Sequence, residues 1–338
     1  MAGTYVVMTA DDGTIQSPEA LTAREPYELH SYYPLLQPLT FSSSFLPLPL
    51  ATAEAWRRAY SGKPLSADEA DLVGELEAQL DEQISSLYAS SGAFVRLSTR
   101  SPKDAADKRD PEIVSAAIAK EMDRAGLLDG RMEVGSPEYD NACLIAVRHA
   151  LFALMCVHSG KEALDLCANS ARVVSDMKRA LDHADALGFH MQLILREFVP
   201  FSITFELRGF VHNGILTALT QYYTDVYSDI LDAAQDDLGP VVDAFFSDQV
   251  APLLASDPAL SNCIVDFVVQ DIDTILVVEL NPFTPETGSG LFDWSEDIHI
   301  LTAPRSPSSP LPFRVLSSIP STVSSSLLPF RHLLPTKP

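Results

Sequence analysis

The sequence predicts an α+β protein of about two domains or lobes. Two pairs of β-branched or aromatic runs, 201–222 and 264–279, are each joined by a short turn and indicate β-hairpins. Elsewhere apolar residues recur at three- or four-residue spacing, the pattern of helices that bury one face. A length of 338 residues allows a large core and favours about two lobes.

The remaining elements follow from the same patterns. A strand is expected over 94–99 and another over 192–200, where a proline ends it. The last helical stretch should break at Gly239-Pro240, because proline removes a helix hydrogen bond. The expected helices are 51–61, 68–88, 111–127, 140–157, 161–183 and 231–254.

The second hairpin has the most informative pattern. Its arms are Ile264–Val269 and Ile275–Glu279, and the polar stretch Gln270–Thr274 connects them. A turn centred near Ile272 and Asp273 places the two arms in antiparallel register.

That register predicts a cluster of oxygen ligands. Asp266 should lie opposite Glu279, and Asn281 should share a face with Glu279 because it is two residues further along. Two carboxylates and an amide oxygen suit Mg²⁺, which usually combines one or two carboxylates with waters and substrate phosphates. The alternative is a hairpin whose polar face simply contacts water.

The first hairpin supplies a candidate phosphate ligand. Its turn is Asn213-Gly214, a strong hairpin sequence. Glu206 and Arg208 lie two residues apart and share a face, so each could position the other. Arg208 is expected to contact a triphosphate, although a cross-strand ion pair would equally account for it.

Cations are also concentrated over 93–105. Arg96 and Ser98 share a strand face, and Arg100 and Lys103 follow in a loop. Arginine forks and a lysine charge could hold phosphate oxygens. Alternatively they pair on the surface with acids nearby, namely Asp104, Asp107 or Asp110.

Composition excludes several classes of function. The net charge of −23, from 46 acidic and 23 basic residues, argues against nucleic-acid and anionic-membrane surfaces. The 4 cysteines form no CxxC pair and no secretion signal is visible, so a cytoplasmic protein with free thiols is expected. Zinc and serine hydrolase motifs are absent.

The chain is expected to divide into four parts. These are an extended segment 1–40, an α+β lobe 41–190, a second lobe 191–302 and a Ser/Pro-rich basic tail 303–338. The tail contains no acids and should be largely disordered, with only the apolar stretch 311–316 able to dock.

The chain contains five short motifs in order: VRLSTRSPKDA, LILREFVPFSITFELRGFV, TQYY, IVDF and VELNPF…LFDW. Together they resemble the cell division cycle protein 123 family across roughly residues 40–316. The resemblance implies an ATP-grasp-type fold in which two lobes clamp ATP and Mg²⁺. It also implies an assembly chaperone for translation initiation factor 2 that binds the γ subunit.

The resemblance also implies roles for individual residues. Asp266, Glu279 and Asn281 would be the Mg²⁺ ligands, and Arg96 and Arg208 would face the phosphates. The segment Arg196, Glu197, Phe198 and Val199 would link the lobes and meet the adenine edge. The sequence departs from the family at three places: Arg96 replaces a lysine, Ser98-Thr99 replaces Asn-Trp, and Glu279-Leu280-Asn281 replaces Asp-Phe-Asn.

Two functional classes compete for such a protein. In one, ATP binding shapes a surface that holds a partner protein, with little or no turnover. In the other, an ATP-dependent carboxylate–amine ligase forms an acyl phosphate. A nucleotide-free scaffold is a third alternative.

Overall fold

The computed structural model describes residues 24–271, 274–306 and 309–335, which form two compact units. Besides residues 24 and 25, unit 1 consists of Ser43–Arg109 and Leu154–Phe198. Unit 2 consists of Pro26–Ser42, Asp110–Ala153 and the described chain from Val199 onward. Each unit is assembled from separate stretches, whereas we expected two continuous lobes, 41–190 and 191–302.

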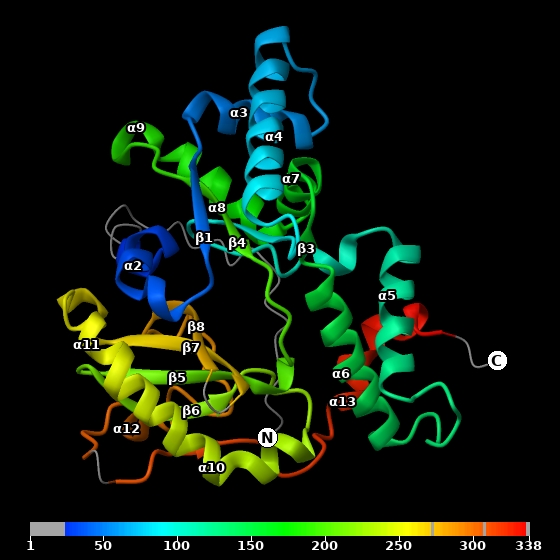
Figure 1. Ribbon diagram of the computed structural model, residues 1–338, viewed down its shortest axis with the longest axis vertical. Coiled ribbons are helices and arrows are strands. Elements are labelled where there is room, and N and C mark those ends of the chain that lie inside the picture. The colour runs from blue at the N-terminus through cyan, green and yellow to red at the C-terminus, as the bar shows by residue number, and fades with distance from the viewer. Residues whose placement is uncertain (1–23, 272–273, 307–308, 336–338) are drawn as a thin grey trace. The chain divides into compact units, whose positions relative to one another are not determined.

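Unit 1 packs an antiparallel sheet with a group of helices (Figure 1). The strands, in spatial order, are β1 (Ser43–Pro47), β4 (Gln192–Glu197), β2 (Ala93–Leu97) and β3 (Cys156–Val157). The helices are α3 (Leu50–Tyr60), α4 (Ala67–Leu87), α7 (Gly160–Ala168), α8 (Ala171–Asp182) and α9 (Ala184–Leu187), with a 3₁₀ turn at Ala106–Lys108.

Local capping explains where the helices of unit 1 begin. Ser66 and Glu69 form a reciprocal capping box at the start of α4. Ser159 caps α7 as its position suggested, and accepts a hydrogen bond from the Glu162 amide at 3.2 Å. Ser170 caps α8, so the expected helix 161–183 is two helices.

Unit 2 contains a mixed five-stranded sheet. In spatial order its strands are β8 (Thr274–Pro282), β7 (Cys263–Asp271), β5 (Glu206–His212), β6 (Ile215–Gln221) and β9 (Phe313–Arg314). Only the β6–β9 pair is parallel in the described sheet. The β5–β6 turn is as predicted, since Asn213 and Gly214 have φ values of 52° and 74°.

Several helices complete unit 2. They are α2 (Leu29–Leu36), α5 (Pro111–Arg124), α6 (Pro137–Ala153), α10 (Asp229–Phe245), α11 (Ala251–Leu254), α12 (Ile298–Leu301) and α13 (Val323–Leu327). Short 3₁₀ helices lie at Gln37–Leu39, Ile203–Phe205, Pro258–Ser261 and Leu328–Leu333, and a π-helical turn spans Phe246–Val250.

Helix α10 covers one face of this sheet (Figure 1), where Phe245 meets Phe267 edge-to-face at 6.2 Å. The predicted break at Gly239-Pro240 is wrong, because α10 continues through both residues. Pro240 is exposed, so water can satisfy the carbonyl group that loses its donor. Gly239 lies against Phe313, and a Cβ built there would be 3.5 Å from that ring.

A covering segment, residues 283–301, packs on the same sheet face as Phe210 and Ile264. Phe292 and Leu301 from this segment complete a buried cluster with those two residues. Phe283 and Trp294 pack edge-to-face at 5.1 Å around it. The sheet of unit 2 therefore has α10 on one face and the covering segment on the other.

The ends of the described chain differ from expectation. Leu29–Leu36, within the stretch expected to be extended, is helical because Leu29, Tyr32 and Leu36 bury one face. In the tail, β9 falls within the stretch 311–316 that was expected to dock, whereas α13 lies where the composition suggested disorder. Arg331 and Ser324 each donate to the buried Asp140 carboxylate at 2.6 Å, which attaches the tail to α6.

No helix within the described residues is both long and apolar enough to cross a membrane. Residues 1–23 of the expected N-terminal segment lie outside the described chain.

Candidate functional site

The candidate site of unit 2 is one row of side chains that crosses its sheet. Thr220 pairs with Arg208, Arg208 with Asp266, and Asp266 with Glu279, on β6, β5, β7 and β8 in turn. Residues paired in register point to the same face. The predicted pairing of Asp266 with Glu279 is therefore confirmed.

Two irregularities in the β7–β8 hairpin cancel each other. The register shifts between Val269 and Asp271 and shifts back between Asp266 and Phe267, so Asp266 still meets Glu279. The expected turn residues Ile272 and Asp273 lie outside the described residues.

Arg208 forms the cross-strand ion pair that we considered as an alternative to phosphate contact. Its Nε and Nη2 donate to the two carboxylate oxygens of Asp266, each at 2.8 Å. The guanidinium also lies 4.9 Å from the Tyr222 ring centre, and its Nη1 donates to the Gly288 carbonyl at 2.6 Å. The side chains of Arg208 and Asp266 are only 12% and 0% exposed.

Burial and charge act in opposite directions on Arg208. Burial lowers the pKa of its guanidinium, but the adjacent Asp266 carboxylate more than offsets this, and the net pKa is raised. Glu279 adds a smaller stabilising charge. Arg208 is therefore a permanent cation within this row.

The three predicted metal ligands are brought onto one sheet face. Asn281 lies two residues beyond Glu279, and its Nδ2 donates to Asp266 Oδ2 at 3.2 Å. Within the described ranges, no three His, Cys, Asp or Glu side chains form a group that could hold a metal. An ion here would need the Asn281 amide oxygen, water or phosphate oxygens besides the two carboxylates, and such a set fits Mg²⁺.

Glu206 is on the same face of β5 as Arg208 and is buried. Its carbonyl accepts from the Tyr222 amide at 2.9 Å, which holds the start of β5 beside the end of β6.

In unit 1, three of the predicted phosphate ligands bind other residues of the same unit. Arg96 is buried in β2, and its Nε donates to the Leu97 carbonyl at 3.1 Å. Ser98 Oγ donates to the sulfur of Met191 at 3.3 Å. Arg100 pairs with Asp176 of α8 at 3.0 Å, and not with the nearby acids that the sequence suggested.

Lys103 is half-buried and follows Arg100 in the same loop. Asp104, one of the suggested surface partners, instead accepts from the Ser170 hydroxyl at 2.5 Å and so anchors the loop to the start of α8.

The segment expected to link the lobes ends β4. Arg196 is buried opposite Phe94, and Glu197 lies opposite Ala93. The Phe198 amide donates to the Gly92 carbonyl at 3.1 Å. Unit 1 ends at Phe198 and unit 2 resumes at Val199, so this segment does join the two units.

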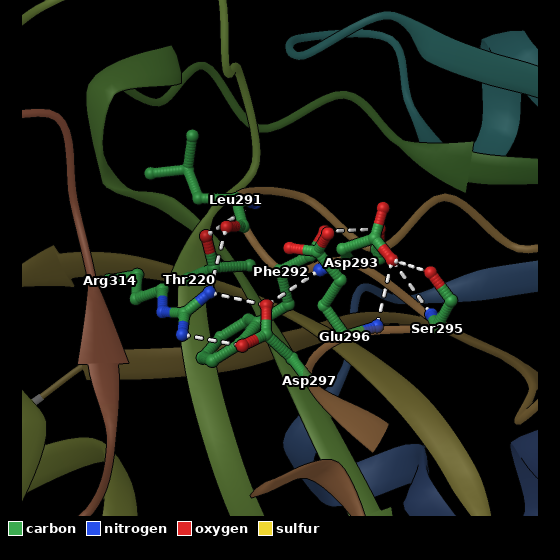
Figure 2. Close-up of polar contacts among 9 residues, drawn as sticks. Thr220, Leu291, Phe292, Asp293, Ser295, Glu296, Asp297 and Arg314 are labelled. Carbon is green, nitrogen blue, oxygen red and sulfur yellow. Dashed lines mark hydrogen bonds and ion pairs between the residues drawn. The ribbon is translucent and has the colours of Figure 1, made fainter. Parts of the chain in front are cut away.

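Sequence reasoning missed a second arginine at the end of the same row. Arg314 of β9 is in register with Thr220, and it binds both carboxylate oxygens of Asp297 at 2.6 and 2.8 Å (Figure 2). Its guanidinium lies 4.2 Å from the Phe292 ring centre. Arg314 falls within 311–316, the stretch of the tail expected to dock, but its partner Asp297 belongs to another segment and could not be identified from the sequence pattern.

This second pair fastens the covering segment. Asp297 Oδ2 also accepts from the Asp293 amide at 2.8 Å, and Thr220 Oγ1 accepts from the Leu291 amide at 3.2 Å (Figure 2). Gly290 has φ 64°, and a Cβ there would lie 2.3 Å from the Thr220 methyl. The motif LFDW thus begins at a close approach between the covering segment and β6.

Comparisons with known proteins agree with the resemblance seen in the sequence. The family model D123 matches residues 150–329, more than half of the chain. Cell division cycle protein 123 of Candida glabrata is 26% identical over 137 residues, which are 39% of this chain and 38% of that protein. The translation initiation factor eIF2 assembly protein of Candida albicans is 31% identical over 105 residues, 31% of this chain and 30% of that protein.

These two matches therefore span about a third of the curated relatives' length. The structural similarity extends further. C-terminally truncated Cdc123 from Schizosaccharomyces pombe has a TM-score of 0.61 at 20% identity, over 88% of this chain and 98% of that one. The expected α+β fold class of ATP-grasp type is confirmed. By its match to the family model over more than half of its length, the chain belongs to the D123 family.

Proposed function

We propose that this protein binds Mg·ATP and assists the assembly of translation initiation factor 2, through contact with the γ subunit. Support for the assembly role comes from family membership and from relatives named as eIF2 assembly proteins. The single observation that supports the nucleotide is the row in which Arg208, Asp266 and Glu279 lie side by side.

The proposed chemistry uses the charges of this row. Glu279 and Asn281, with Asp266, would supply oxygen ligands to Mg²⁺, and the bound ion would neutralise part of the nucleotide's charge. Arg208 would orient a phosphate oxygen while Asp266 holds its guanidinium in a fixed plane. In unit 1, Arg96, Ser98, Arg100 and Lys103 are the further proposed phosphate contacts, and the backbone of 196–199 would meet the adenine.

The nucleotide proposal is tested by calorimetry on the full chain. Glu279→Gln keeps the side-chain shape but removes a charge, so Mg·ATP affinity should fall about tenfold or more. Glu296→Gln, an exposed acid of the covering segment, is the matched control and should bind normally. Equal affinity in both variants would contradict the proposal, and so would an absence of Mg·ATP binding by the wild type.

The partner proposal has a separate test. Purified protein should retain the γ subunit of factor 2 in a pull-down, and Mg·ATP should increase the amount retained. Rapid ADP formation with amino or carboxylic acids, in the absence of a protein partner, would instead identify a ligase. Retention that is independent of ATP would support the nucleotide-free scaffold.

A further inference from the structure

A cationic pocket lies within unit 1, and the residues that line it include none of the predicted site residues. It is a cavity of about 380 Å³ between the end of α3, the loop 61–66, the start of α4 and α8. Its lining residues are Glu54, Arg57, Arg58, Tyr60, Ser61, Lys63, Glu69, Val174 and Lys178.

The charge of this pocket is opposite to that of the chain. Four cations and two carboxylates line it, a balance of +2 in a protein whose net charge is −23. Arg58 is partly neutralised by Glu69 at 3.0 Å. Within the described ranges, neither Arg57 nor Lys63 forms an ion pair, so their charges are available to a ligand.

The walls of the pocket are held in place before any ligand arrives. The Ser61 hydroxyl donates to the Arg57 carbonyl at 2.7 Å, and the Lys63 amide donates to the Arg58 carbonyl at 3.1 Å. Arg58 Nη2 then reaches across the loop to the Pro64 carbonyl at 3.0 Å. These contacts fix the backbone of the loop, so binding would order mainly side chains.

Tyr60 also lines the pocket and has a polar atom without a partner. Its hydroxyl is buried and forms no hydrogen bond with any of the described residues. Burial raises the pKa of Tyr60, so the group keeps its proton at neutral pH. Buried hydroxyls are nearly always satisfied by protein, water or a bound group.

Helix stabilisation accounts for only part of this arrangement. Arg57 and Arg58 lie in the last turn of α3, where cations favour the helix dipole. That effect does not require Lys63 from the loop or Lys178 from α8 to line the same cavity. The convergence of three chain segments is better explained by a ligand.

We propose that this pocket binds a phosphate group, carried either by a small phosphorylated molecule or by a phosphorylated side chain of another protein. The Arg57 fork can hold two phosphate oxygens and Lys63 adds a point charge. The volume is within the range of small-ligand sites. Glu54 is placed to accept from hydroxyl groups of such a ligand, and Val174 offers an apolar contact.

The test measures pyrophosphate binding to the full chain by calorimetry, at low salt and with EDTA to remove magnesium. Arg57→Gln/Lys63→Gln should weaken binding by about tenfold or more. Arg109→Gln/Lys161→Gln changes the net charge equally within the same unit and should have less than about a twofold effect. Arg57→Gln/Lys63→Gln should still bind Mg·ATP, in the presence of magnesium, as the wild type does, which separates this site from the proposed Mg·ATP site.

Two further probes identify the source of the phosphate. A phosphoserine peptide that binds about tenfold tighter than free phosphoserine would indicate a protein ligand. Equal affinities would indicate a small molecule. The proposal is overturned if the wild type does not bind pyrophosphate, or if both double variants lose affinity alike while their circular-dichroism melting curves match the wild type.

Discussion

The sheet of unit 2 carries two arginine–aspartate pairs that have the same chemistry but different surroundings. Arg208–Asp266 joins two inner strands and is almost fully buried. Arg314–Asp297 joins the edge strand to the covering segment, and its side chains are 39% and 15% exposed. Both arginines bind two carboxylate oxygens and lie over an aromatic ring.

The difference shows how burial determines what an ion pair contributes. A buried charge that loses its partner keeps its full desolvation cost, whereas a partly exposed charge is rehydrated. Removing one partner of the inner pair should therefore cost much stability, and removing one partner of the outer pair should cost little. The following predictions test this contrast, beginning with the largest effect.

Asp266→Ala should lower the free energy of unfolding by about 3–5 kcal/mol, because it leaves the Arg208 guanidinium buried and unpaired. Urea denaturation measures this loss. The double variant Asp266→Ala/Arg208→Met removes both charges and should recover much of it. If Asp266→Ala alone lost less than about 1 kcal/mol, the buried pair would behave like an exposed ion pair.

Gly290→Ala should cost roughly 1–3 kcal/mol, since it adds a clash with Thr220 to an unfavourable positive φ. Gly126→Ala is the matched control, because Gly126 has φ 68° but open space around its Cβ position. Adding Thr220→Ser to Gly290→Ala removes the methyl and should restore part of the stability. Equal losses at Gly290 and Gly126 would show that the close approach to Thr220 is unimportant.

Arg314→Ala should cost only about 1 kcal/mol, because the guanidinium is partly solvated. The matched control is Arg131→Ala, which breaks a pair to Asp129 whose arginine is 86% exposed, and should change stability by less than about 0.5 kcal/mol. Thermal unfolding of the two variants side by side compares them. If Arg314→Ala were as damaging as Asp266→Ala, exposure would not explain the difference between the pairs.

The Arg314–Asp297 pair should also make the free energy of unfolding depend on pH. The hydrogen bond from Arg314 holds the pKa of Asp297 below its usual value. The resulting stabilisation is present above the unfolded-state pKa, near 4, and is lost as the pH falls through the lower folded-state pKa. Asp297→Asn should therefore be less stable than wild type at pH about 6, and this difference in the free energy of unfolding should narrow as the pH falls below about 4.

Urea titrations at pH about 6 and at successively lower pH values measure this difference. The same substitution made in an Arg314→Ala background should show a smaller pH dependence, because the largest cause of the lowered pKa is gone. If the difference in stability between wild type and Asp297→Asn did not change with pH, titration of Asp297 would not be its cause.

The hairpins illustrate what could be predicted from sequence. Alternation along each strand and the lengths of the two turns were enough to place Asp266 opposite Glu279 and to identify the Asn213-Gly214 turn. These are relations between neighbours in the chain, where local backbone geometry is decisive. For Arg208 the sequence left two alternatives open, a phosphate contact and a cross-strand ion pair. The choice between them depends on β5 lying beside β7.

Contacts between distant stretches were not predictable in this way. Asp176, the partner of Arg100, is 76 residues further along the chain. Most of the tail was expected to be disordered because a segment dominated by Ser and Pro buries little apolar surface, but it is held by Asp140 and Asp297, which are supplied by other segments. Helix α10 continues through Pro240 because its buried face and exposed proline offset one lost hydrogen bond.

The amino-acid sequence by itself determined the hairpins, most helices, the shared face of Glu279 and Asn281, and the family resemblance. Each of these depends on residues a few positions apart or on short ordered motifs. Only the tertiary structure decided that Arg208 binds Asp266, that Arg314 fastens the covering segment, and that Arg57 and Lys63 line one pocket. Those outcomes depend on which strands and helices become neighbours, and this is set by burial of the whole core, which no single stretch specifies.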